Sequence, residues 1–74
     1  MYSLVGVDSN AFAIMGYVKQ AMKREGFKDH VNEYMTQAMS SDYNNLLVIS
    51  MDWIDRINDK IATESSDDDE ESIG

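Results

Sequence analysis

Residues 42–61 read DYNNLLVISMDWIDRINDKI, and their pattern distinguishes an all-helical fold from a mixed one. Apolar or small side chains recur every three or four positions, as on one face of a helix, and charged side chains share the opposite face. The first set is Leu46, Leu47, Ser50, Trp53, Ile54, Ile57 and Ile61, and the second is Asp52, Asp55, Arg56 and Asp59. The alternative is a strand at residues 46–51 that pairs with residues 2–7. Because the charged stripe fits a helix better, the pattern predicts a helix over residues 42–61.

Two further helices are predicted before this segment. Three good N-cap residues, at positions 8–10, open the predicted helix over residues 10–25, which carries one apolar stripe. Gly26 ends this helix, and Phe27 can fold back on it as in a Schellman motif. Residues 29–39 have the most regular helical period in the chain. The two apolar stripes are Ala11, Ile14, Met15, Val18, Ala21 and Met22, and then Val31, Tyr34, Met35, Ala38 and Met39.

Length and composition fit a single small domain. The chain has 74 residues and contains no cysteine, so neither a disulfide nor a thiolate-bound metal supplements its modest core. We therefore expect an all-α fold, a small three-helix domain that allows a short N-terminal β-strand at residues 2–7. A lone strand leaves backbone groups unpaired at both edges. This strand and the apolar surface of the first helix predict association into a homo-oligomer.

The negative charge is concentrated near the C-terminus. The chain has 14 acidic and 6 basic residues and a formal net charge of −8, but residues 1–62 hold only eight of the acidic residues and so carry −2. We expect residues 1–62 to form the helical domain and residues 63–74 to be an acidic tail that is disordered on its own. The tail either keeps the protein soluble or attracts a basic partner surface. Its acidic residues are Glu64, Asp67, Asp68, Asp69, Glu70 and Glu71.

The first predicted helix offers a surface for a partner. Phe12, Ala13 and Tyr17 lie outside its apolar stripe, so its first two turns are apolar on nearly all sides. Ala13 and Gly16 together make a patch of small residues that another backbone can approach. We therefore predict that Phe12, Ala13, Gly16 and Tyr17 contact a second copy or a partner protein.

No residue pattern predicts catalysis or metal binding. The single histidine, His30, is expected in the first turn of the second helix, away from its apolar face, and no Ser–His–Asp or Cys–His arrangement can be proposed. Asp8 and Asn10 begin like a calcium loop, but Phe12 and Gly16 stand where ligands or the turn would be needed. We expect no enzymatic activity, no catalytic residue, no bound metal and no cofactor.

Aromatic and basic residues suggest a second kind of function. Aromatic rings and lysines are the groups that hold nucleotides. Asn10, Tyr17, Lys19 and Lys23 are the candidate residues for such a ligand. One chain of this size is too small for an internal pocket, so the ligand would lie between subunits. The alternative is that the tyrosines lie at the edge of the core with solvated hydroxyls.

Three segments resemble small proteins encoded by bacteriophages and prophages. They are residues 5–12 (VGVDSNAF), 15–18 (MGYV) and 41–47 (SDYNNLL). The resemblance covers most of residues 5–60 and carries over no catalytic residue, and the acidic tail departs from it. It implies that the chain binds and inhibits a host factor, or sequesters a defence signal.

These observations predict a non-enzymatic accessory protein of phage type that binds and inhibits a host protein. The alternative is an oligomeric sponge that sequesters a nucleotide-like signalling ligand between subunits. The negative charge argues against nucleic acid as a partner, and the longest apolar run is too short to span a membrane. Because the N-terminus lacks the basic region of a signal peptide, we expect the protein in the cytoplasm of the host cell.

Overall fold

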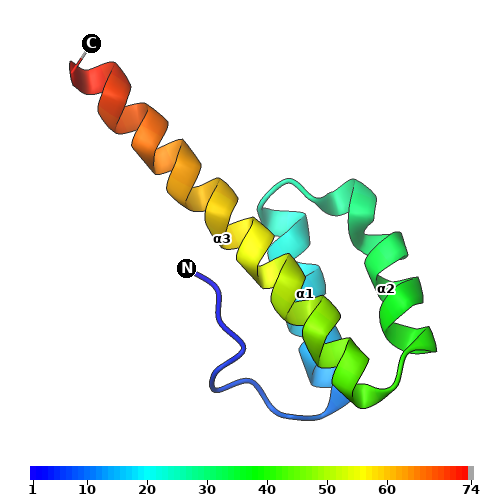
Figure 1. Ribbon diagram of the computed structural model, residues 1–74. Helices are drawn as coiled ribbons and strands as arrows, with labels where there is room; N and C mark the ends of the chain where they lie inside the picture. Colours follow the sequence, from blue (N-terminus) through cyan, green and yellow to red (C-terminus); the bar gives the residue numbers. More distant parts are fainter. Residues whose placement is uncertain (74) are drawn as a thin grey trace.

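The computed structural model has three α-helices and describes the backbone of residues 1–73 and the side chains of residues 1–64. The helices are α1 (Ala11–Arg24), α2 (Val31–Ser40) and α3 (Tyr43–Ile73), and a short 3₁₀-helix, η1 (Lys28–His30), precedes α2. Figure 1 shows α1 and α2 packed against the first half of α3, which then continues past them. The predicted all-α, three-helix fold is confirmed, and residues 46–51 are helical rather than extended.

The ends of α1 follow the sequence signals. The side chain of Asn10 caps the helix by accepting a hydrogen bond from the backbone N–H of Phe12 at 2.8 Å. At the other end, the N–H of Phe27 donates to the carbonyl of Met22 at 2.7 Å, and Gly26 has a φ of +90°. These are the defining features of the Schellman motif, so the predicted end of this helix is confirmed.

The second and third helices begin in different ways. No side chain caps α2, whose first turn is entered from η1, where the N–H of His30 donates to the carbonyl of Phe27. Asp42 caps α3, and its Oδ1 accepts from the N–H of Asn45 at 2.8 Å. In the structure α3 continues to Ile73, past the predicted end of this helix at residue 61. The domain boundary at residue 62 and the disorder of the tail stay predictions.

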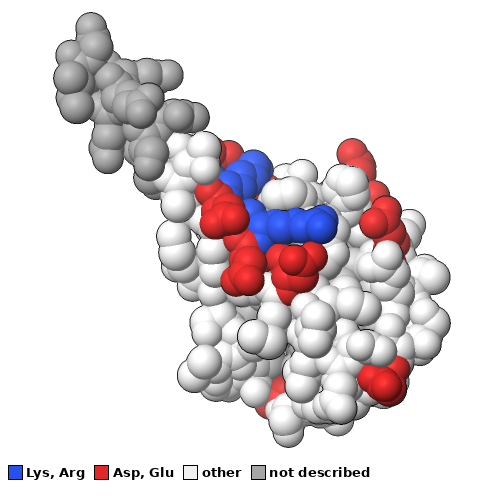
Figure 2. All heavy atoms as spheres, viewed as in Figure 1, with Lys and Arg blue, Asp and Glu red and all other residues white. Residues whose placement is uncertain are grey.

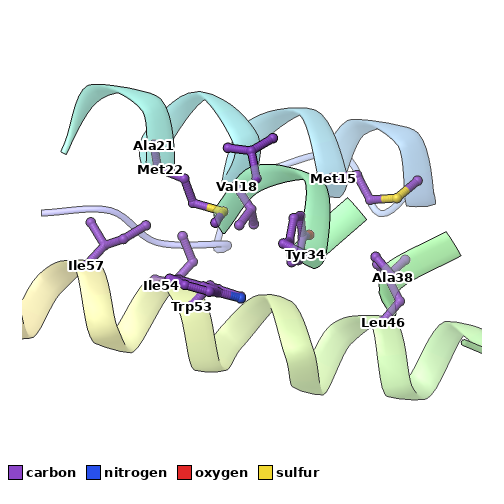
Figure 3. Close-up of a cluster of buried hydrophobic side chains, with 11 residues drawn as sticks. Met15, Val18, Ala21, Met22, Tyr34, Ala38, Leu46, Trp53, Ile54 and Ile57 are labelled. Carbon is purple, nitrogen blue, oxygen red and sulfur yellow. The ribbon is translucent and has the colours of Figure 1, made fainter. Parts of the chain in front are cut away.

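The core lies between the three helices and is almost entirely apolar. Figure 3 shows side chains of α1, α2 and α3 meeting in it. The ring of Trp53 lies 5.5 Å from that of Phe27 in an edge-on arrangement. Tyr34 and Ser50 are completely buried and hydrogen-bond to each other. The cluster consists of Met15, Val18, Ala21, Met22, Val31, Tyr34, Ala38, Leu46, Trp53, Ile54 and Ile57.

The N-terminal residues form a strap across the helices instead of the expected strand. Residues 1–73 contain no strand, and Leu4 and Val7 are joined by a turn in which Gly6 has a φ of +87°. The side-chain amide of Asn58 accepts a hydrogen bond from the N–H of Tyr2 and donates one to its carbonyl, both at 2.9 Å. This amide thus supplies the donor and acceptor that a neighbouring strand would have supplied. We call residues 2–9 the N-terminal strap.

Candidate functional site

An open apolar groove lies where α1 and α3 begin and α2 ends, at the lower end of the bundle in Figure 1. Its volume is about 380 Å³. We call it the end groove, and it is lined by Ala11, Phe12, Met15, Ala38, Met39, Ser41, Tyr43 and Leu46. Apart from Ser41 and the Tyr43 hydroxyl, these side chains offer no hydrogen-bonding group. The end groove therefore suits an apolar side chain of another molecule.

The floor and the rim of the end groove differ sharply in exposure. Met15, Ala38 and Leu46 form the floor and are at most 5% exposed. On the rim, Phe12 is 75% exposed and Met39 is 64% exposed. Large apolar side chains left in water next to a concave apolar surface are a common mark of a protein-binding site. The floor belongs to the folded core, while the rim remains free for a partner.

Helix caps and the turn between α2 and α3 position the rim. The cap of Asn10 begins α1 so that Phe12 lies in its first turn. The Oγ of Ser41 donates to the carbonyl of Gln37 at 2.7 Å and closes the last turn of α2. The hydroxyl of Tyr43 donates to the carbonyl of Ser9, which ties the strap to the start of α3. Hydrogen bonds at the ends of α1 and α2, and one between the strap and α3, thus hold the segments that form the rim.

The four predicted interface residues differ in exposure and in what they contact. Phe12 lines the end groove, and Gly16 is exposed, with open space within 4 Å of where a Cβ would lie. Ala13 is half-buried. Tyr17 is half-buried by the strap, and its hydroxyl accepts from the N–H of Ser3 at 3.0 Å. Its ring also contacts the ring of Tyr2 edge-on, with 6.1 Å between centroids.

The four candidate ligand residues do not converge within one chain. The amide oxygen of Asn10 is engaged in the cap of α1, and the hydroxyl of Tyr17 is engaged with the strap. Tyr17 and Lys19 are two positions apart on α1, and side chains at that spacing point to opposite sides of a helix. Lys19 is half-buried and Lys23 is exposed. A shared site for these residues would require a second copy.

Of the acidic tail, only Glu64 has a described side chain, and it pairs with Lys60 at 3.5 Å. The other predicted tail residues lie outside the described side chains. They are Asp67, Asp68, Asp69, Glu70 and Glu71.

His30, Tyr2 and Tyr34 each lie against another side chain. The ring of His30 lies 5.6 Å from that of Trp53, at the end of η1. Within the described part of the chain, no three acidic, histidine or cysteine side chains are grouped so as to hold a metal. Burial raises the pKa of the Tyr34 hydroxyl, which the hydrogen bond with Ser50 partly offsets. Burial also raises the pKa of Tyr2, and its hydrogen bond with Glu25 raises it further. Both are phenols that hold the structure together.

A second, smaller hollow lies beneath the strap. It has a volume of about 250 Å³ between the strap and α3. Here Met51 is exposed, while the hollow also contains the polar groups of Asp55 and Asn58. Because Asn58 already binds the strap, this hollow belongs to the packing of the N-terminus.

Sequence reasoning missed the contribution of Met39 and Tyr43 to the site. Met39 belongs to the predicted apolar stripe of the second helix. In the structure it lies in the last full turn of α2, beyond the surface that α1 and α3 cover. The useful signal was local, because Met39 and Tyr43 flank the polar turn at residues 40–42. Apolar residues directly beside a turn tend to lie at the end of a bundle.

No protein-family model, curated protein or solved structure matches the chain. Over the described residues, none of the helices combines the length and the apolar character needed to cross a bilayer.

Proposed function

We propose that the chain is a small, non-enzymatic binding protein that docks on another protein through its end groove. The observation that carries this proposal is the apolar rim, in which Phe12 is 75% and Met39 is 64% exposed above a buried apolar floor. In a helix-in-groove complex, an apolar side chain of the partner enters such a groove and covers the rim. Methionine side chains adapt to different shapes, which suits this role.

The energetics require more than the rim alone. Complete burial of a large apolar side chain contributes about 1.5–3 kcal/mol. Since Phe12 is 75% and Met39 is 64% exposed, covering both supplies about 2–4 kcal/mol, while association costs at least about 4 kcal/mol in lost freedom of motion. The partner must add its own buried anchor and further contacts for a stable complex to form.

In the context implied by the resemblance to phage proteins, the partner is a protein of the host cell and binding inhibits it. The three segments that carry the resemblance hold most of the residues that line the end groove. These are Ala11, Phe12, Met15, Ser41, Tyr43 and Leu46. This overlap supports the end groove as the contact surface.

Capture from a bacterial extract with matched variants tests the proposal. Phe12→Ser and Met39→Ser, combined, remove the apolar rim but leave the buried floor in place. Val48→Ser is the control, because Val48 is 65% exposed and lies outside the end groove. We expect the wild type and the control to retain the same host protein and the double variant to lose it. Equal retention by the double variant would contradict the proposal, provided that circular dichroism shows it to be folded.

A second candidate is an oligomeric sponge for a nucleotide-like ligand. It is favoured by the spacing of Phe12, Gly16, Lys19 and Lys23, which follows one side of α1, and by the absence of acidic residues from α1. Light scattering gives the mass of the particle, and a thermal shift against a nucleotide panel tests binding. A larger particle whose melting temperature rises with a nucleotide, and does not rise in Lys19→Gln/Lys23→Gln, would favour this candidate over the first.

A further inference from the structure

The charges at the mouth of the end groove are acidic. Asp42 lies between Ser41 and Tyr43, both of which line the end groove. Asp8 precedes Ser9, whose carbonyl accepts from Tyr43 at the rim. Both aspartates are exposed. They bring negative charge to the part of the bundle where the apolar rim is open.

Both carboxylates can bind a further donor. One oxygen of Asp8 accepts from the N–H of Asn10 at 2.9 Å, and one oxygen of Asp42 accepts from the N–H of Asn45 at 2.8 Å. An ionised carboxylate has two oxygens and about four acceptor positions, so these hydrogen bonds leave room for a lysine or arginine. The helix N-termini at α1 and α3 each offset about half a charge, and the C-terminus of α2 restores about as much. The mouth therefore keeps a net negative charge.

Basic residues are placed elsewhere in the fold. All lysines and arginines fall in residues 19–28 and 56–60. Along the chain, the basic residue nearest to a residue of the end groove is Lys19, which lies one helical turn after Met15. Figure 2 shows basic side chains gathered near the point where α3 leaves the bundle, and only acidic ones at the lower end of the face in view. The basic side chains in view thus lie away from the end groove, with acidic side chains among them.

We infer that the partner of the end groove is a basic amphipathic helix, with an apolar anchor that enters the groove and lysine or arginine residues that pair with Asp8 and Asp42. This inference rests on the proposed function and specifies the chemistry of its partner. Charge pairs of this kind add orientation and speed of association to the apolar contact. The net charge of −8 attracts a basic segment over longer distances as well.

A second copy of the chain does not supply such a segment from its described side chains. The exposed large apolar residues are Met1, Val5, Phe12, Met39, Tyr43, Val48 and Met51. None of them falls in the basic stretches, residues 19–28 and 56–60. Phe12 shares a side of α1 with Lys19 and Lys23, but it is already a rim residue of the end groove, so we assign the basic helix to a different protein.

Fluorescence anisotropy with the full chain and a labelled synthetic helix tests this inference. The probe is about four turns long, with leucines on one face and lysines on the other, and a matched probe has glutamate at each lysine position. We expect the lysine probe to bind more tightly than the glutamate probe, with an affinity that falls as salt is added. Binding of the lysine probe should be lost in the Phe12→Ser/Met39→Ser variant.

Replacing the two aspartates with asparagine separates the effect of charge on binding from the effect on folding. Asn accepts hydrogen bonds through its amide oxygen and is as good an N-cap residue as Asp, so Asp8→Asn/Asp42→Asn keeps the cap of α3 and the bond from the N–H of Asn10. Loss of an exposed ion pair weakens binding about two- to fivefold, so we expect the double variant to bind the lysine probe about four- to 25-fold more weakly. Asp59→Asn, an exposed aspartate on α3 far from the end groove, is the control and should change the affinity by less than twofold.

The outcomes distinguish this inference from the proposed function. If the two probes bind alike and only the Phe12→Ser/Met39→Ser variant fails, the end groove binds helices without regard to charge and the inference is wrong. If the lysine probe binds equally to that variant, it binds outside the end groove, and the inference is again wrong. Absence of binding by the wild type overturns it as well. The proposed function is judged separately, by capture of the host protein.

Discussion

Tyr34 and Ser50 form the polar contact inside the core. Ser50 is the buried polar residue of the described chain, and its hydroxyl lies 2.7 Å from that of Tyr34 on the neighbouring helix. Each hydroxyl satisfies the other, and no buried side-chain polar atom in the described part lacks a partner. A single hydrogen bond of this kind contributes modestly, but leaving one hydroxyl unpaired in the core is costly. The pair therefore fixes how α2 sits on α3.

Separate and joint replacement of these two residues should give non-additive effects. Ser50→Ala leaves the Tyr34 hydroxyl buried without a partner, so we expect a loss of about 1–3 kcal/mol of unfolding free energy. Tyr34→Phe should cost less, because a helical serine can donate to a carbonyl of its own preceding turn. Urea unfolding of the two single variants and the double variant measures the coupling. A double variant that loses the full sum of the single losses would contradict this account.

Alkaline pH should destabilise the protein through Tyr34. Burial raises the pKa of this phenol above its ordinary value of 10.0 in the folded state. The unfolded chain therefore loses the proton first, and the stability that the neutral phenol contributes is complete below about pH 10 and declines as the pH rises through the folded-state pKa. Tm measured from pH 8 to pH 11 should fall more steeply in the wild type than in Tyr34→Phe. Because the pKa of Tyr2 is raised too, the variant should retain a smaller decline.

Among the elements, α1 owes its end to one glycine and one lysine. Gly26 adopts a φ of +90°, which residues with a side chain rarely take. The Nζ of Lys60 donates to the carbonyl of Glu25 and lies 2.7 Å from where a Cβ on Gly26 would be. The same ammonium group lies 5.4 Å from the centre of the Phe27 ring. The C-terminus of α1 is thereby attached to α3.

The two glycines that flank the second half of α1 should respond to alanine in opposite ways. Gly26→Ala forces a left-handed conformation on a residue with a Cβ, so we expect a loss of about 1–2 kcal/mol of unfolding free energy. Gly16→Ala meets open space on a helical surface and should gain up to about 1 kcal/mol. Thermal and urea unfolding of both variants measures this.

The Gly16→Ala variant also tests self-association. If Gly16 contacts a second copy, Gly16→Ala would weaken that association. The isolated chain would still become more stable. Loss of stability in Gly16→Ala together with a smaller particle by light scattering would contradict the open surface described for this residue.

At the scale of the whole molecule, the described core and the acidic C-terminal residues are separate in the sequence. The buried core extends from Met15 to Ile57. Five of the acidic residues lie in residues 65–74, which account for most of the formal net charge of −8. Folding and long-range charge therefore depend on different parts of the chain.

Deletion of residues 65–74 should separate these two properties. It reduces the formal net charge from −8 to −3, since five acidic residues and no basic ones are removed. We expect Tm to change by less than about 3 °C, because the core is retained. Association with a basic helix should become slower at low salt while its dissociation rate stays the same, as stopped-flow fluorescence would show. A large loss of Tm would mean that the C-terminal residues pack on the bundle.

Local patterns were sufficient for the three helices and for the caps of α1 and α3, whereas α2 begins at Val31 rather than at residue 29. The stripe from Leu46 to Ile61, the cap at Asn10 and the Schellman motif at Gly26 all depend on residues within a few positions of each other. The predicted charged face of the third helix also holds an i,i+4 pair of Asp52 and Arg56 at 3.3 Å. Such features follow from the helical repeat and from backbone groups that need partners at helix ends.

Contacts between distant residues were decided only by the tertiary structure. The amide of Asn58 replaces a strand as the partner of Tyr2 across 56 positions, so residues 2–7 became a strap. The hydroxyl of Tyr17 accepts from the N–H of Ser3 in the same strap, across 14 positions. The end groove likewise arises where the ends of three helices meet, and no periodicity along one helix reveals how far its neighbours cover it. Sequence alone thus determined that three helices form and where α1 and α3 start, since those depend on neighbours along the chain. The exposed rim of Phe12 and Met39 required the packing of all three helices in space.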